Sequence, residues 1–217
     1  MIQKNTFLVG VTMFLLCLFV TETVLAAATP EYPPLFGSRE RRYKDIKAFE
    51  KWTRVLERYE SLKPVDGRPC DPFFHDSCDV PSWPDFLTSI EGKTPLEKIV
   101  AVNDYQNQAK YLTDPVNWKV EDYWETPDEF FARNGDCEDY AIAKYLSLRQ
   151  IGFEPSDLRI LVVQDLNLNV GHAIMVAYLD GRALILDNQI NQVIDSHKIK
   201  HYKIQYSINE KFWWRHR

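Results

Sequence analysis

The feature that most constrains the fold is the separation of helix signals from strand signals along the chain. In the first part, Thr94 and Thr126 each begin a Thr-Pro-x-Glu sequence, which supplies a threonine N-cap, a proline at N1 and a glutamate at N3. After residue 157, short runs rich in β-branched and aromatic residues dominate instead. Helices followed by an antiparallel sheet predict an α+β fold.

Helical spacing of apolar residues predicts one helix over residues 40–62. The two Thr-Pro signals predict a second helix from residue 94 to about 112, and a short one from 126 to about 134. A further helix follows Cys137 and stops at Gly152. The proline-rich residues 27–37 are expected to be extended, and residues 64–84 to form a long loop.

The C-terminal part predicts strands at 158–163, 172–179, 182–187 and 202–206, with an aromatic segment at 212–214 closing the chain. Asp180 and Gly181 are typical of a two-residue hairpin turn. That turn places Ile174 opposite Asp187, and His172 opposite Gln189 if pairing continues that far. His172 and Asp187 are then diagonal neighbours on one sheet face, unless the register slips by one residue.

Residues 1–26 have the three regions of a secretory signal peptide: Lys4, an apolar run from Phe7 to Val20, and a small-residue processing site ending at Ala26. An uncleaved membrane anchor is the alternative. Residues 27–217 are expected to form a single exported domain. The net charge of −5 argues against a nucleic-acid partner, because phosphate binding requires a basic patch.

Three cysteines follow the signal peptide. In an oxidising compartment, the close spacing of Cys70 and Cys78 favours a disulfide between them and leaves Cys137 free. Two reduced structural thiols, or a metal site that includes His75, are the alternatives.

Cys137 lies in the sequence Gly-Asp-Cys-Glu-Asp, at a turn before a helix. The positive end of a helix dipole favours a thiolate there. The flanking carboxylates oppose it, since one like charge at ~4 Å and an effective dielectric near 20 costs ~4 kcal/mol. A nucleophile at this position therefore requires a positive charge that offsets the carboxylates.

A helix packed on the hairpin could bring Cys137 to His172 and Asp187, giving a nucleophile, a base and a residue that orients the base. Taken singly, each residue has an ordinary structural alternative: a small buried cysteine, a hydrogen-bonded histidine and a turn aspartate. Their combination on compatible elements favours catalysis.

The segments 122–129, 135–144, 171–172 and 186–188 resemble the bacterial transglutaminase-like cysteine proteinases. The resemblance covers about residues 95–188 and implies a papain-like/transglutaminase-like core with Cys137, His172 and Asp187 as the catalytic triad. Gly171, where alanine is expected, and Lys119, where glycine is expected, depart from the family pattern.

The same resemblance implies a calcium-dependent periplasmic endopeptidase. It carries Asp136, Glu138 and Asp139 over as metal ligands. Calcium needs further oxygens, for which the loop at Glu121–Tyr123 is a candidate source. The alternative is that these acids only complement the dipole of the helix. It implies cleavage at a di-alanine site near the N-terminus of a large surface adhesin, which controls biofilm attachment. It also implies inhibition by the periplasmic domain of an inner-membrane cyclic-di-GMP receptor. An acyltransferase or transglutaminase with the same triad, or a non-catalytic calcium-binding module, are the alternatives.

Overall fold

The computed structural model describes residues 32–61 and 82–217. Apart from β1, the strands follow the α-helices along the described chain, as the sequence predicts. The α-helices in the described residues are α1 (Glu50–Ser61), α2 (Trp83–Ser89), α3 (Pro95–Gln106), α4 (Asp114–Asn117), α5 (Pro127–Arg133) and α6 (Cys137–Gln150). The strands there are β1 (Glu40–Tyr43), β2 (Leu158–Asp165), β3 (Val170–Leu179), β4 (Arg182–Leu186), β5 (Ile194–Asp195), β6 (Tyr202–Ile208) and β7 (Trp213–His216).

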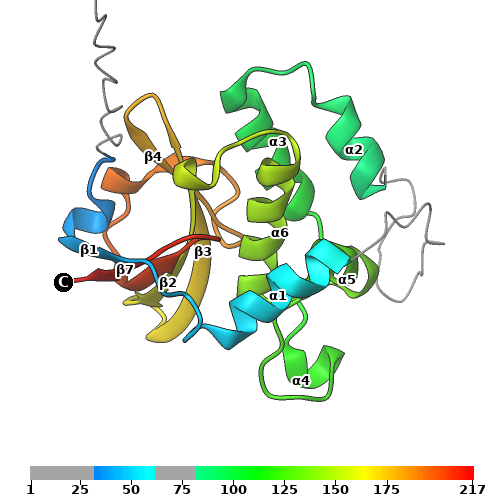
Figure 1. The fold of residues 1–217 in the computed structure, drawn as a ribbon, viewed down its shortest axis with the longest axis horizontal. Helices are drawn as coiled ribbons and strands as arrows, with labels where there is room; N and C mark the ends of the chain where they lie inside the picture. The colour runs from blue at the N-terminus through cyan, green and yellow to red at the C-terminus, as the bar shows by residue number, and fades with distance from the viewer. Residues whose placement is uncertain (1–31, 62–81) are drawn as a thin grey trace, which may run out of the picture. The chain divides into compact units, whose positions relative to one another are not determined.

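The strands form one sheet in the order β1-β7-β6-β2-β3-β4-β5 (Figure 1). Every pair of neighbours is antiparallel. The predicted α+β class is therefore confirmed. Within residues 32–61 and 82–217, no helix has the length and apolar character that crossing a membrane requires.

The hairpin of β3 and β4 has the predicted register. Leu179 pairs with Arg182 across the turn, and Met175 pairs with Leu186. Asp180 and Gly181 adopt φ of 50° and 72°, the left-handed conformations that such a tight turn requires. Pairing ends at Met175 and Leu186, so the condition for placing His172 opposite Gln189 is not met, and the two strands separate where the site begins.

Helix α6 is the central element of the core. It packs against β3 and β2, and α3 packs against α6, as Figure 1 shows from the labelled ribbons. From β3, Met175 and Ala177 join the apolar cluster beneath α6, whereas Ile174 and Val176 join a second cluster on the other sheet face. Because both faces of β3 are buried, its position relative to α6 is well fixed.

The two Thr-Pro signals form the helix starts that the sequence predicts. Thr94 with Glu97, and Thr126 with Glu129, make complete capping boxes at the starts of α3 and α5. Helix α3 ends at Gln106, however, six residues before the predicted end. The chain then turns at residues 107–109, and the backbone N–H of Leu112 donates to the carbonyl of Gly135 at 2.9 Å.

Several other boundaries differ from the predictions. Residues 40–43 are strand β1 rather than helix, because they pair with β7. Trp83 and Pro84 begin α2 rather than ending a loop, since Ser82 caps the helix. Residues 35–37 form a 3₁₀ turn instead of an extended segment, and α4 and β5 were not predicted. The signal peptide and the Cys70–Cys78 disulfide lie outside the described residues.

Candidate active site and metal centre

Cys137 is the first residue of α6, and the preceding glycine explains how the chain reaches it. A Cβ at Gly135 would lie 2.7 Å from the Cβ of Asp139, so only glycine fits. The Oδ2 atom of Asp139 accepts the backbone N–H of Asp136 at 3.0 Å, which fixes the first turn of the helix. The acidic motif thus fixes the position of the cysteine.

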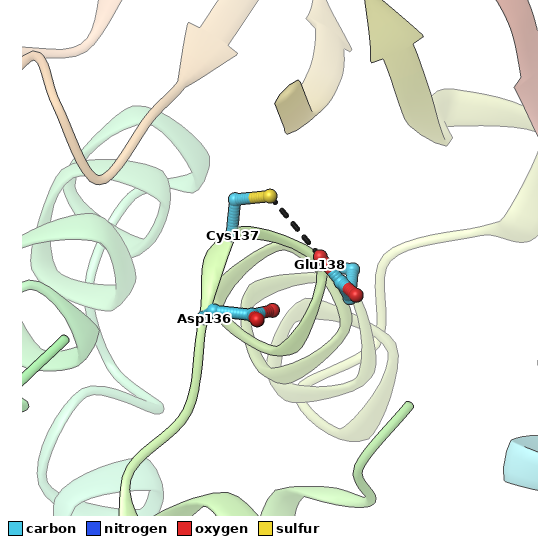
Figure 2. Close-up of side chains that lie close together, drawn as sticks. All are labelled: Asp136, Cys137 and Glu138. Carbon is cyan, nitrogen blue, oxygen red and sulfur yellow. Dashed lines mark hydrogen bonds between the residues drawn. The ribbon is translucent and has the colours of Figure 1, made fainter. Parts of the chain in front are cut away.

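The sulfur of Cys137 lies beside β3. The backbone N–H of Ala173, the residue after His172, is near enough to the sulfur to oppose part of the rise in its pKa. Its own S–H donates to Oε2 of Glu138 at 3.1 Å, as Figure 2 shows together with Asp136. Burial, followed by the charge of Glu138, raises the pKa of the thiol well above its usual range.

His172 and Asp187 form a buried pair. Nε2 of His172 lies 2.9 Å from Oδ1 of Asp187, and the two residues are only 3% and 1% exposed. An ionised carboxylate accepts hydrogen bonds only, so Nε2 carries the proton and Nδ1 remains as the basic nitrogen. The predicted pairing of these two side chains is therefore present.

Asp187 is held in its ionised form. Burial alone would raise its pKa, but the hydrogen bond and charge of His172, with hydrogen bonds from Tyr202 and the Gln189 backbone, hold the pKa below its ordinary value. The hydroxyl of Tyr202 donates to Oδ2 at 2.7 Å. Asn107, the C-cap residue of α3, donates to the backbone carbonyl of Asp187 at 2.8 Å, which anchors the chain after β4.

A lysine is buried close to this pair. Lys144 lies two turns along α6 from Cys137, and its ammonium has no hydrogen-bond partner among the described residues. Burial lowers its pKa to about 7, and the negative charges of Asp187 and Asp104 partly offset that effect. The amine therefore interacts electrostatically with Asp187 across the interior of the domain.

An acidic cluster adjoins the start of α6. Carboxylate oxygens of Asp114, Asp122 and Glu138 lie within 4.8 Å of one another, and Asp136 and Glu138 form a similar group with the cysteine sulfur. Burial raises the pKa of Asp136 to about 8, with further contributions from Glu138. Burial also raises the pKa of Asp114 to about 6. So many carboxyl groups together favour a bound cation.

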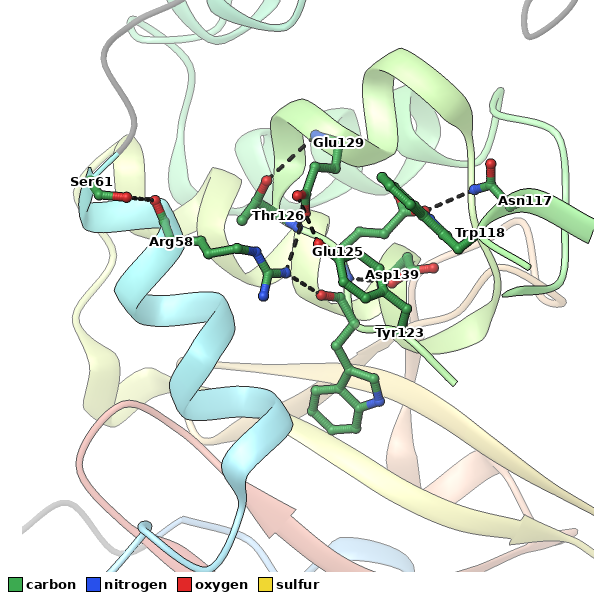
Figure 3. Close-up of polar contacts among 10 residues, drawn as sticks. Arg58, Ser61, Asn117, Trp118, Tyr123, Glu125, Thr126, Glu129 and Asp139 are labelled. Carbon is green, nitrogen blue, oxygen red and sulfur yellow. Dashed lines mark hydrogen bonds and ion pairs between the residues drawn. The ribbon is translucent and has the colours of Figure 1, made fainter. Parts of the chain in front are cut away.

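A third acidic group, of Asp114, Glu125 and Asp139, lies deeper. Figure 3 shows Glu125 between Asn117, which donates to its Oε1 at 2.9 Å, and Asp139, which accepts its backbone N–H at 2.8 Å. Both oxygens of Asp139 thus accept backbone N–H groups. This contact supports the helix start, and the prediction that Asp139 is a metal ligand stays untested.

Some carboxylate oxygens of these acidic groups have no hydrogen-bond partner, which shows whether the groups suit a bound cation. Within the described part of the chain, Oδ1 of Asp136, Oδ1 of Asp114 and Oε2 of Glu125 are buried without a hydrogen-bond partner. A buried carboxylate oxygen without a partner is costly. Hard cations such as calcium take six to eight oxygen ligands, so this donor set fits calcium. Asp114 and Glu125 were not predicted, because only the fold brings them to Asp136.

Comparison with known proteins agrees with this geometry. Residues 75–216 match the family model of the bacterial transglutaminase-like cysteine proteinases. The chain belongs to this family. The match confirms the predicted family and extends beyond the triad segments to the last strand of the sheet. A comparison with curated proteins gave no significant match.

Solved structures of LapG from Legionella pneumophila are similar to this chain. Calcium-bound LapG from Legionella pneumophila is 28% identical, with a TM-score of 0.57 over 75% of this chain and 86% of LapG. EGTA-treated LapG from the same organism is also 28% identical, with a TM-score of 0.58 over 75% of this chain and 84% of LapG. The predicted transglutaminase-like fold is therefore confirmed.

Proposed function

We propose that this cysteine proteinase is a calcium-dependent periplasmic endopeptidase that cleaves the N-terminal region of a large surface adhesin. A di-alanine sequence is the proposed cleavage site, and control of biofilm attachment is the proposed outcome. The observation that carries the chemistry is the buried pair of His172 and Asp187. On β3, the backbone N–H of Ala173, the residue after His172, acts on the pKa of the Cys137 thiol.

In the proposed mechanism, Nδ1 of His172 takes the proton of Cys137, and the thiolate attacks the peptide carbonyl. The imidazolium then protonates the leaving amine, and the acyl-enzyme forms as the C–N bond breaks. His172 next removes a proton from a water molecule, whose oxygen attacks the acyl carbon. The C–S bond then breaks, the acid product leaves, and the imidazolium returns its proton to the sulfur. Asp187 keeps the ring oriented throughout, and the backbone N–H of Cys137 donates to the oxyanion.

The acidic cluster gives this mechanism its calcium dependence. Asp136 and Glu138 would hold the ion, with Asp114 as a further ligand because its Oδ1 has no other described partner. When bound, calcium supplies positive charge that offsets the carboxylates beside the thiolate. Calcium-bound and EGTA-treated structures exist for LapG, which supports extending a calcium site to this chain.

Location and regulation complete the proposal. The signal peptide predicted at residues 1–26 directs the chain to the periplasm. There, the periplasmic domain of an inner-membrane cyclic-di-GMP receptor would sequester and inhibit the enzyme. These two elements rest on the sequence resemblance.

Cleavage of a defined substrate tests the proposal. The purified protein, incubated with calcium and an adhesin N-terminal fragment, should release two fragments with free termini at a di-alanine site. Cys137→Ala protein should release none, because the nucleophile is absent. Mass spectrometry distinguishes hydrolysis from transfer, since a new amide or isopeptide bond in the product would contradict an endopeptidase. An uncut fragment would contradict the proposed substrate.

A further inference from the structure

An exposed apolar loop leads directly into the strand of His172. Leu166 and Leu168, in the turn between β2 and β3, are 55% and 60% exposed, and Val170 at the start of β3 is 47% exposed. Apolar side chains concentrated in five residues of a surface loop are typical of an interaction site. This surface, formed by Leu166, Leu168 and Val170, is called the apolar loop below.

The loop is held in place by its own hydrogen bonds. Oδ1 of Asp165 accepts the backbone N–H groups of Asn167 at 2.8 Å and Leu168 at 3.1 Å. The backbone N–H of Leu166 donates to the carbonyl of His201 at 2.8 Å. Because these bonds fix the backbone, the leucines are presented to solvent without a large ordering cost on binding.

The first half of β3 has an open edge. Strand β3 pairs with β2 from Val170 onward, but with β4 only from Met175 to Leu179. Among the described residues, no strand therefore pairs with Val170–Ile174 on the β4 side. This unpaired edge is exposed at Val170 and Gly171, next to the apolar loop, and becomes buried from His172 onward.

The register shows which backbone groups face that edge. In a two-residue hairpin the flanking residues, here Leu179 and Arg182, form the hydrogen-bonded pair. Alternate residues of β3, including Ala173 and Gly171, then direct their N–H and C=O groups to the β4 side. The effect of the Ala173 N–H on the pKa of Cys137 agrees with this direction. The backbone of Gly171 therefore faces the open edge beside the sulfur.

Space at Gly171 is also open. A Cβ built on this residue would meet nothing within 4 Å, and its φ lies outside the positive range that favours glycine. Neither packing nor backbone strain therefore explains the glycine. The missing side chain instead leaves room next to His172, where a second chain can approach β3 closely.

We propose that an extended segment of the protein substrate pairs with β3 at Gly171 and places apolar side chains on the apolar loop. This inference rests on the proposed endopeptidase function and specifies how the substrate is held. Strand addition supplies backbone hydrogen bonds, and alternate side chains supply specificity. The substrate class is accordingly an extended protein segment with large apolar residues on one side of the scissile bond.

Substitution of the loop tests this surface. Leu166→Ser/Leu168→Ser protein should cleave the adhesin fragment with kcat/KM at least tenfold lower, mainly through KM. Its rate of Cys137 alkylation by iodoacetamide should be unchanged, because the triad is intact. The matched control is Leu96→Ser/Val100→Ser, which removes two apolar side chains that are 39% and 38% exposed on α3. That control should cleave like the wild type.

A second measurement needs no protein variant. The substrates are peptides that span the cleavage site, each N-methylated at a different backbone nitrogen. The peptide methylated at the nitrogen that pairs with Gly171 should be cleaved with a kcat/KM at least tenfold lower than that of the unmethylated peptide. The inference would be overturned if the loop variant cleaved the adhesin fragment as well as the wild type does and every methylated peptide were cleaved as well as the unmethylated one. A loop substitution that weakened only the binding of an inhibitory protein would not rescue it. If the wild type cleaves no fragment, the proposed function fails and this inference fails with it.

Discussion

Replacing His172 with alanine should lower kcat/KM for cleavage by at least about 10³-fold, because both proton transfers in the mechanism lose their carrier. The substitution removes the base and also the partner that stabilises the thiolate of Cys137. Asp187→Asn should cause a smaller loss, since His172 stays in place while its orientation and charge stabilisation weaken. The measurement is steady-state cleavage of the adhesin fragment with calcium present.

His197→Ala is the matched control for this prediction. His197 also bonds an aspartate through one ring nitrogen, at 2.6 Å from Asp195, but its side chain is 69% exposed. Its loss should leave cleavage unchanged. If His172→Ala protein retains wild-type activity while folding normally, the assignment of the general base is wrong.

Chelation of calcium should abolish cleavage, and calcium rather than magnesium should restore it. Magnesium demands near-octahedral geometry at shorter distances and keeps its waters, whereas a broad cluster of carboxylates suits the larger ion. Calcium should also raise the unfolding temperature, because a ligand that binds only the native state adds about 2.7 kcal/mol at 100 times its Kd. Calorimetry with and without calcium measures the change in unfolding temperature independently of activity.

Substitutions of the ligands refine the calcium prediction. Asp136→Asn and Glu138→Gln should each reduce calcium affinity by at least tenfold, as each removes a negatively charged oxygen from the site. Glu91→Gln, on an exposed loop, is the control and should bind calcium like the wild type. Full activity in excess chelator, or an unchanged unfolding temperature, would exclude the calcium centre.

Local signals explain which parts of the fold were predictable. Asp180-Gly181 fixed the hairpin register, and Thr-Pro-x-Glu fixed two helix starts, because each depends on residues a few positions apart. Strand β1 was misread as helix because its partner is the C-terminal strand β7. The helix predicted from residue 40 begins only at Glu50, because residues 40–43 take part in a pairing that local patterns do not show.

The residues of the candidate site also fall into those that local sequence signals indicated and those that only the tertiary fold brings together. His172 and Asp187 were predictable because one hairpin carries both. Tyr202 and Asn107 were missed, since their contacts with Asp187 depend on how β6 and α3 pack around the hairpin. The acidic residues beside Cys137 were visible in the motif. The carboxylates of Asp114 and Glu125 reach them only through the tertiary fold.

The rate of Cys137 alkylation at pH 6 with calcium present is the most direct measurement of the central claim, since only the thiolate reacts quickly. Wild-type protein should react at least tenfold faster than His172→Ala protein, because the imidazolium holds the sulfur in its charged form. Equal rates in the two proteins would mean that His172 does not activate the sulfur, and would contradict the proposed enzyme.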